Sequence, residues 1–253
     1  MTGATSGIGE ACAKALAEAG CNLYLTGRRS ERLEEIARKY RSDYGVEISC
    51  FSFDVTDREE VREAIGEILK DGVVDICINN AGLALGLEPL DMGNPDDWDR
   101  MIDTNIKGLL YIAGPVMAHM KSRNRGHMVN IGSIAGETAY PGGNVYCATK
   151  SAVHMLSEAM LADAYGSAVK VTTVAPGAVD TEFSDIRFGG DMERRDAVYE
   201  GYEPLKGEDI ADLVLYILDT PAHVDIQYCR VMPTAQRNPY LLYREKQSEG
   251  SEK

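Results

Sequence analysis

The sequence predicts an α/β protein with a doubly wound parallel sheet, that is, a sheet with helices on both faces. Short apolar runs rich in Val, Ile, Cys and Phe alternate with longer stretches of helical apolar spacing, and the runs are bounded by Gly, Asp, Asn or Pro. A glycine-rich loop opens the first helical stretch. No linker or internal repeat divides the 253 residues. We therefore expect one domain, residues 1–244, and a polar, disordered tail, residues 245–253.

The expected elements alternate along the chain. Strands are predicted at 22–26, 47–53, 75–79, 127–131, 169–174 and 228–232. Helices are predicted at about 9–19, 30–44, 58–70, 95–123, 144–165 and 207–219. Asp57 is the expected N-cap of the third helix, and Gly20 and Gly166 are expected to follow the ends of two others. In an open sheet of this kind, ligands bind beyond the carboxyl ends of the strands.

Composition and charge narrow the function. The net charge of −14 opposes binding to nucleic acid or to an anionic membrane, so an anionic ligand would need a local basic pocket. No apolar run approaches the roughly 18 residues of a membrane span, and the N-terminus does not resemble a secretory signal. The histidines and cysteines lack the spacing of metal ligands. We expect a cytoplasmic protein with reduced cysteines, no metal, and a small molecule as its substrate.

The opening loop, Gly3-x-x-x-Gly7-x-Gly9, has the composition of a phosphate-binding turn. Glycines allow the backbone to turn tightly and to approach a pyrophosphate at a helix N-terminus. Taken alone, the loop is weak evidence, and a tight turn without a ligand is the alternative.

Five motifs together resemble the short-chain dehydrogenase/reductase family. The glycine loop, Asn79-Asn80-Ala81-Gly82, Ser133, Tyr146-x-x-x-Lys150 and Pro176-Gly177 occur in the order and spacing of that family across nearly the whole chain. Several further segments resemble its NADP-dependent 3-hydroxy acid dehydrogenases, among them 181–184 and 221–224. That group acts on L-allo-threonine, serine and related acids. The resemblance implies a Rossmann-like fold and a homotetramer.

The resemblance implies four catalytic residues. Tyr146 is the acid/base, Lys150 supports it one helical turn away, and Ser133 orients the substrate oxygen. Asn105 corresponds to the asparagine that holds a proton-relay water. Lowering a phenol pKa from about 10 to about 7 requires roughly 4 kcal/mol, so we expect Lys150 to act together with the oxidised nicotinamide. The alternatives are an amphipathic helix edge for Tyr146 and Lys150, a turn cap for Ser133 and a helix contact for Asn105.

The family also implies the cofactor site. The turn after the strand at 22–26 carries Arg28 and Arg29 and no carboxylate, which favours the 2′-phosphate of NADP(H) over NAD(H). The alternative is that both arginines are a solvated first helical turn. The remaining expected cofactor contacts are Gly3, Thr5, Ser6, Gly7, Ile8, Gly9, Asp54, Val55, Asn80, Ala81, Gly82, Tyr146, Lys150, Pro176, Gly177, Val179 and Thr181.

A substrate carboxylate needs a cation, and Arg187 is the candidate. It lies in a long loop with Gly189 and Gly190, which we expect to be a mobile lid over the active site. An ion pair of Arg187 with Asp185 or Asp191 is the alternative.

The chain departs from the family at its start. Only Met1 and Thr2 precede Gly3 of the glycine loop, whereas the family places a first strand of five or six apolar residues there. We therefore expect the first, central strand to be missing, and a start site assigned too late to be the reason. The expected activity is NADP-dependent hydride transfer with a 3-hydroxy acid. The alternatives are a reductase of another ketone or aldehyde, and an inactive NADP-binding remnant.

Overall fold

Parallel strands form two groups in the protein. The computed structural model describes residues 1–245, so most of the tail predicted at 245–253 lies outside the described residues. One group pairs β1 (Leu23–Gly27) with β2 (Ile48–Ser52). The other has the order β3-β4-β5-β6, with bounds Ile76–Asn79, Gly126–Ile131, Val169–Pro176 and Tyr228–Val231. All four strand pairings are parallel, as predicted.

The first residues of the chain pass between the two groups. Met1 donates from its amino group to the Tyr24 carbonyl (2.7 Å) and accepts from the Thr26 amide (3.0 Å). On the other side, the Thr2 amide donates to the Ile78 carbonyl of β3 (3.0 Å). These bonds join the groups at the carboxyl ends of β1 and β3. No strand is assigned before α1 in residues 1–245.

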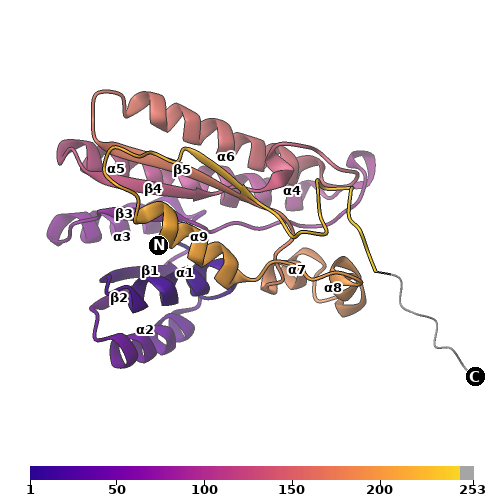
Figure 1. Cartoon of the computed structure of the whole chain (residues 1–253), viewed down its shortest axis with the longest axis horizontal. Coiled ribbons are helices and arrows are strands. Elements are labelled where there is room, and N and C mark those ends of the chain that lie inside the picture. The colour runs from indigo at the N-terminus through magenta and orange to yellow at the C-terminus, as the bar shows by residue number, and fades with distance from the viewer. Residues whose placement is uncertain (246–253) are drawn as a thin grey trace, which may run out of the picture.

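Helices cover both faces of the sheet (Figure 1). On one face, α1 (Gly7–Glu18) packs against α9 (Gly207–Leu218) and α2 (Ser30–Tyr44). On the other, α3 (Arg58–Asp71) and α5 (Leu109–Ser122) pack together, and α6 (Asn144–Asp163) packs on β5. Each face has its own apolar core, because the strand side chains alternate between the two. The arrangement confirms the predicted doubly wound fold class.

The capping residues predicted from the sequence lie at the helix ends, as expected. The Asp57 carboxylate accepts from the amides of Glu59 and Glu60, as expected for the N-cap of α3. Gly20 and Gly166, after α1 and α6, both adopt a φ of +81°, a conformation that favours glycine. No helix among residues 1–245 is long and apolar enough to cross a membrane.

Two predicted segments differ from the structure. The helix expected at 95–123 is interrupted: α4 (Pro95–Ile102) continues through a π-helical turn, Asp103–Gly108, into α5. The loop expected after Pro176-Gly177 contains two short helices, α7 (Glu182–Arg187) and α8 (Met192–Tyr199). The side chains of Thr181 and Asp191 cap the N-termini of these helices, which stabilises helix where a loop was expected.

Candidate active site

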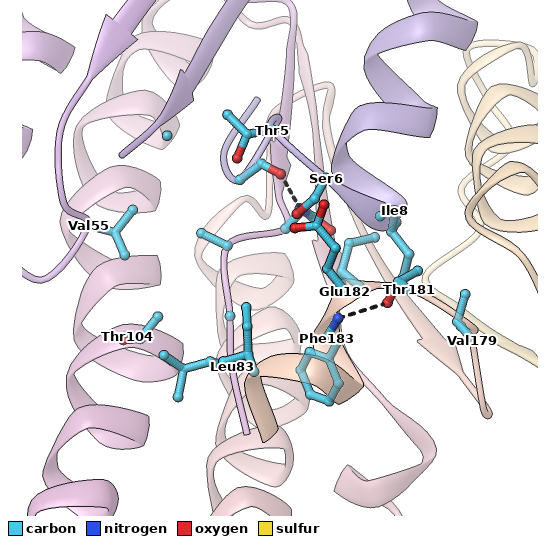
Figure 2. Close-up of a pocket in the computed structure, with 18 of the residues that line it drawn as sticks. Thr5, Ser6, Ile8, Val55, Leu83, Thr104, Val179, Thr181, Glu182 and Phe183 are labelled. Atoms are coloured by element: carbon cyan, nitrogen blue, oxygen red, sulfur yellow. Dashed lines mark hydrogen bonds between the residues drawn. The ribbon is translucent and has the colours of Figure 1, made fainter. Parts of the chain in front are cut away.

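A cavity of about 400 Å³ lies at the carboxyl ends of the strands, under α7. All of the predicted catalytic and cofactor residues line it except Gly9 and Asn105, and the predicted substrate residue Arg187 is not among its lining residues. Figure 2 shows Thr5, Ser6 and Ile8 on the glycine loop, with Thr181, Glu182 and Phe183 of the α7 segment close by. The structure therefore brings together residues that are up to about 180 positions apart in the sequence. They meet beyond the carboxyl ends of the strands, where open α/β sheets bind their ligands.

The glycine loop has the geometry that a closely approaching anion requires. Gly3 has a φ of +64°, and a Cβ there would lie 2.8 Å from the Asn80 side-chain nitrogen. A Cβ at Gly9 would collide with the carbonyl oxygen of Gly3, so the first turn of α1 can pack on the loop only with glycine. The N-cap residue Ser6 makes no side-chain capping bond. The loop thus presents backbone and a free hydroxyl at the N-terminus of α1, where negative charge is stabilised.

Asn80 holds this loop against the end of β3. Its side-chain nitrogen donates to the carbonyl oxygens of Thr2 and Gly3, both at 3.1 Å. The Thr2 hydroxyl in turn accepts from the backbone amides of Asn80 (3.0 Å) and Ala81 (2.9 Å). Asn80 and Ala81 are therefore fixed in place as one wall of the cavity.

The two predicted 2′-phosphate arginines lie at the cavity rim in ion pairs. Arg28 is 3.6 Å from Asp54, whose pKa is lowered: burial opposes the shift, but bonds from Thr56 and the charge of Arg28 outweigh it. Arg29 donates to the Thr5 hydroxyl (3.0 Å) and forms an ion pair with Glu182 (3.0 Å). Both guanidinium groups line the cavity. A bound anion would therefore compete with a carboxylate for each arginine.

Tyr146, Lys150 and Ser133 lie on one side of the cavity. Tyr146 and Lys150 are one turn apart on α6 and are both buried, at 8% and 6% exposure. The Lys150 amine donates to the Ile131 carbonyl (2.9 Å) and lies 6.0 Å from the centre of the Tyr146 ring. Ser133 follows β4, and its hydroxyl accepts from the Ala135 amide (3.1 Å). The three predicted groups are thus brought together.

Burial controls the protonation of this site. It raises the pKa of Tyr146, although a hydrogen bond with Ser133 and the charge of Arg187 act in the opposite direction. Burial also lowers the pKa of Lys150 to about 8. In the protein by itself, Tyr146 is therefore a neutral phenol that can donate a proton.

Asn105 lies behind the cavity wall, in the π-helical turn between α4 and α5. Its amide oxygen accepts from the Leu83 amide (2.9 Å), and its nitrogen donates to the Leu83 carbonyl (2.8 Å) and the Thr149 hydroxyl (3.0 Å). These bonds tie the segment after Gly82 to α6. π-Helical turns occur frequently at functional sites. The relay role of Asn105 remains a prediction.

Arg187 extends from α7 toward Tyr146. It donates to the Gly86 carbonyl (3.2 Å) and to the Tyr140 hydroxyl (2.9 Å). Its guanidinium carbon lies 5.5 Å from the centre of the Tyr140 ring and 5.6 Å from that of Tyr146. The remaining nitrogen, Nη2, is buried and has no hydrogen-bond partner among the described residues. A buried donor of this kind requires an acceptor, and a carboxylate is the strongest one.

The alternative ion pair for Arg187 is not found in residues 1–245. Asp185 instead lies 3.3 Å from the Arg195 side chain, and Asp191 caps α8 by accepting from the Arg194 amide (3.1 Å). Both acidic residues predicted as competing partners are therefore engaged elsewhere.

Three site residues were not predicted from the sequence: Glu182, Phe183 and Tyr140. Thr181 begins α7 by accepting from the Phe183 amide at 3.3 Å (Figure 2). The Phe183 ring packs 5.8 Å from that of Tyr146, centre to centre. The Thr-Glu-Phe sequence is a recognisable helix start, but it does not indicate that Glu182 and Phe183 lie over the cavity. No local pattern indicates the role of Tyr140.

Comparisons with known proteins agree with this geometry. Residues 1–188 match a family model described as short chain dehydrogenase. The chain is 43% identical over 240 residues to the NADP-dependent 3-hydroxy acid dehydrogenase YdfG of Salmonella typhi, which covers 93% of this chain and 94% of the relative. It is 42% identical over 238 residues, again 93% and 94% of the chains, to sulfoacetaldehyde reductase 2 of Chromohalobacter salexigens. A solved structure described as the closed form of serine dehydrogenase complexed with NADP⁺ superposes with a TM-score of 0.87, at 40% identity, over 97% of this chain and 98% of that one.

Proposed function

Because the chain belongs to the short-chain dehydrogenase family, we propose that it oxidises a short 3-hydroxy acid, such as serine or allo-threonine, with NADP⁺, or reduces the corresponding semialdehyde with NADPH. Hydride transfer between NADP(H) and a carbon that bears a hydroxyl group is the general reaction of its relatives. The observation that carries the finer assignment is the buried Nη2 of Arg187 beside Tyr146, which has no hydrogen-bond partner within the described part of the chain.

The residues around the cavity fit a dinucleotide with a 2′-phosphate. The loop from Gly3 to Gly9 and the N-terminus of α1 would hold the pyrophosphate, and Arg28 and Arg29 would hold the 2′-phosphate. The predicted contacts at Asp54-Val55, Asn80–Gly82 and 176–181 form the walls between these groups and Tyr146. When bound, the nicotinamide supplies or accepts the hydride at the substrate carbon.

Tyr146 handles the proton in this proposal. In reduction the phenol gives its proton to the substrate oxygen, and in oxidation the phenolate takes the proton from the hydroxyl group. The Ser133 hydroxyl donates a hydrogen bond to the same oxygen and so positions it. The Lys150 ammonium, held by the Ile131 carbonyl, stabilises the negative charge that develops on Tyr146. Asn105 fixes the backbone beside Lys150 through Leu83.

Arg187 supplies the recognition of the acid. Two of its nitrogens are held by Gly86 and Tyr140, which fixes the guanidinium plane and leaves Nη2 to donate to a substrate carboxylate. The same donor would accept a sulfonate, and one relative is named a sulfoacetaldehyde reductase. A sulfonated short aldehyde is therefore the second candidate substrate.

A substrate panel tests the proposal. NADPH oxidation is measured with a carboxylated, a sulfonated and an uncharged short aldehyde, and NADP⁺ reduction with serine, allo-threonine and a 3-hydroxy acid without an amine. We expect kcat/KM to be highest for the anionic compounds. A preference for the uncharged aldehyde would contradict the acid assignment and favour a general ketone or aldehyde reductase. Absence of turnover with every compound, together with NADPH binding, would indicate the non-catalytic alternative.

The assembly and location remain expectations from the family. A homotetramer built partly on α6 and β6 would cover Met155 and Tyr228, which are 65% and 44% exposed in the single chain. Light scattering of the purified protein measures the assembly directly. A mass of one chain would contradict the expected tetramer.

A further inference from the structure

His154 of α6 lies against the segment that carries Ser133. Its Nε2 accepts a hydrogen bond from the backbone amide of Ser133 at 3.3 Å. A Cβ at Gly132 would lie 2.4 Å from this nitrogen, and a Cβ at Gly136 would lie 2.6 Å from Cε1 of the same ring. Glycine at both positions therefore leaves room for the imidazole. The backbone on both sides of Ser133 is shaped to receive the His154 side chain.

The bond from Ser133 to His154 is made where the pairing of β4 ends. β4 pairs with β5 as far as Ile131, and the Gly132 amide still donates to a carbonyl of β5 (2.7 Å). The next amide, that of Ser133, lies beyond this ladder and has the imidazole as its acceptor. Lys150, one turn earlier on α6, donates to the Ile131 carbonyl (2.9 Å). Two successive turns of α6 thus hold the end of β4 on either side of Gly132.

The other polar groups of Ser133 are held within the turn that follows it, η3 (Ile134–Gly136). The Ser133 carbonyl accepts from the Gly136 amide (2.9 Å), and the hydroxyl accepts from the Ala135 amide (3.1 Å). Ser151 of α6 fixes the far end of this turn by donating to the Gly136 carbonyl (2.7 Å). His154 fixes the near end, and the amide plane that it holds precedes the Cα of Ser133. The direction of the Ser133 side chain therefore depends on this bond.

The bond requires a neutral imidazole. An amide can donate only to a free lone pair, so the ring must carry its proton on Nδ1, and a protonated ring would have no acceptor. Burial lowers the pKa of His154 and the charge of Lys150 lowers it further, whereas the charges of Glu137 and Glu158 act in the opposite direction. The net effect is a lowered pKa, which keeps the ring neutral at pH 7 and the acceptor available.

Two side chains of β6 surround the ring and the nearby carboxylate of Glu137. Tyr228 meets the His154 ring nearly edge-on, with 5.5 Å between the ring centres, and its hydroxyl donates to Glu137. Arg230 forms an ion pair with the same carboxylate at 2.9 Å. Glu137 is thus compensated by a cation and a hydroxyl group, which limits its attraction for a proton on His154.

We propose that His154 is a positioning residue for hydride transfer: its neutral imidazole holds the Ser133 amide, and thereby the hydroxyl that binds the substrate oxygen, and protonation of the ring releases them. The inference rests on the proposed function, because Ser133 acts on the substrate oxygen in that reaction. It adds an acid-sensitive control to the site, since turnover would fall as His154 takes up a proton while Tyr146 still carries the proton that it donates.

The pH dependence of aldehyde reduction tests this role. The substrates are the carboxylated 3-oxopropanoate and the uncharged propanal, and kcat is measured between pH 5 and pH 8. In this direction Tyr146 acts as an acid, so its own titration removes no activity as the pH falls. Saturating NADPH keeps the 2′-phosphate, which titrates near about pH 6, from affecting kcat through cofactor binding.

Two variants separate the acceptor from the titration. His154→Gln keeps an acceptor near the position of Nε2 and cannot be protonated in this range, whereas His154→Leu has no acceptor. His119→Gln is the matched control. The Nε2 of His119 also accepts from a backbone amide, that of Val74, at 3.3 Å, but His119 lies on α5 and does not line the cavity at Tyr146.

We expect the unchanged protein to lose kcat as the pH falls below 6.5, and His154→Gln to retain most of its kcat throughout the range. His154→Leu should lose about 10- to 100-fold in kcat at pH 7, because the oxygen contact is displaced. The loss should be equal for the two aldehydes, since the contact is to the oxygen and not to the carboxylate. His119→Gln should keep the rate and the pH profile of the unchanged protein. Full activity in His154→Leu, or the same loss of kcat at low pH in His154→Gln, would overturn the proposal.

A measurement without turnover separates this inference from the proposed function. The ¹⁵N chemical shift of the Ser133 amide, labelled selectively through the Gly132–Ser133 pair, should titrate together with the His154 ring. The Ser167 amide, in the Gly–Ser pair at 166–167, should not follow it. A Ser133 amide that does not follow His154 would overturn the proposal. If the unchanged protein reduces neither aldehyde, the proposed function fails, and the amide titration still decides whether His154 holds Ser133.

Discussion

Replacing Arg187 with Met should separate acid recognition from hydride transfer. The side chain keeps a similar length but loses every donor. Nε of Arg187 donates to Gly86 and Nη1 to Tyr140, whereas Nη2 is buried and has no hydrogen-bond partner in residues 1–245. In the proposed function, the substrate carboxylate gains one charge-assisted hydrogen bond from Nη2. Such a bond contributes about 1.5–3 kcal/mol, which corresponds to about 10- to 150-fold in kcat/KM.

The assay compares two aldehydes of similar size, 3-oxopropanoate and propanal, each reduced with NADPH. Arg187→Met also releases α7 from Gly86 and Tyr140, so some loss is expected for both substrates. The ratio of their kcat/KM values removes this shared effect and isolates the carboxylate contact. We expect the ratio to fall by about 10- to 150-fold.

Arg194→Ala is the matched control for this variant. Arg194 lies on the neighbouring α8, stacks 5.0 Å from the Phe188 ring and is 3.9 Å from Glu88. Its removal takes one cation from the same region of the surface without a contact to Tyr146. An unchanged ratio in Arg187→Met, or an equal change in Arg194→Ala, would refute the carboxylate role.

Three further predictions concern Tyr146, Glu182 and His127. Tyr146→Phe should abolish turnover and leave NADPH binding within about twofold by fluorescence titration, because only the proton is lost; retained turnover would refute its role as acid/base. Glu182→Gln frees Arg29 from a half-exposed ion pair worth about 0.2–1 kcal/mol, so NADPH should bind up to about fivefold more tightly while NADH does not; Glu35→Gln is the charge-matched control, and equal tightening of NADH would contradict the competition. Burial lowers the pKa of His127 from 6.5 to about 4, so the unfolded chain takes up the proton first and stability is lost as pH falls through this window, by about 2–3 kcal/mol. Urea unfolding at pH 7 and pH 4.5 should show a smaller loss for His127→Asn, and equal losses would refute this cause.

The fold was largely predictable because its signals are local and periodic. The strand β4 is buried on both faces, as its sequence predicts. The start of α3 is indicated by its capping residue, Asp57. The interruption between α4 and α5 was not predictable in this way. The π-helical turn at Asp103–Gly108 continues the helical spacing, and only tertiary contacts of Asn105 with Leu83 and Thr149 distinguish it.

The candidate site was predictable wherever a motif carries its own chemistry. The glycine loop, Ser133, Tyr146 and Lys150 have spacings that carry chemical meaning, and all of them except Gly9 line one cavity. Tyr140 and Glu182 could not be found in the same way. Tyr140 acts by holding a side chain 47 positions away, and Glu182 by pairing with Arg29, 153 positions away. Such contacts exist only after the chain has folded.

The pairing of charges around the cavity explains how a protein with a net charge of −14 can take up anions. The outer cations, Arg28 and Arg29, are already neutralised by carboxylates at 3.6 and 3.0 Å. No carboxylate pairs with the inner cations, Lys150 and Arg187, within residues 1–245. The cations without a carboxylate partner in residues 1–245 therefore lie beside Tyr146, where burial strengthens their attraction for an anion. An anion is therefore bound most strongly beside Tyr146, whereas at the cavity rim it must displace Asp54 or Glu182 from an arginine. Substitutions of these two carboxylates should change cofactor binding and leave turnover nearly unaltered.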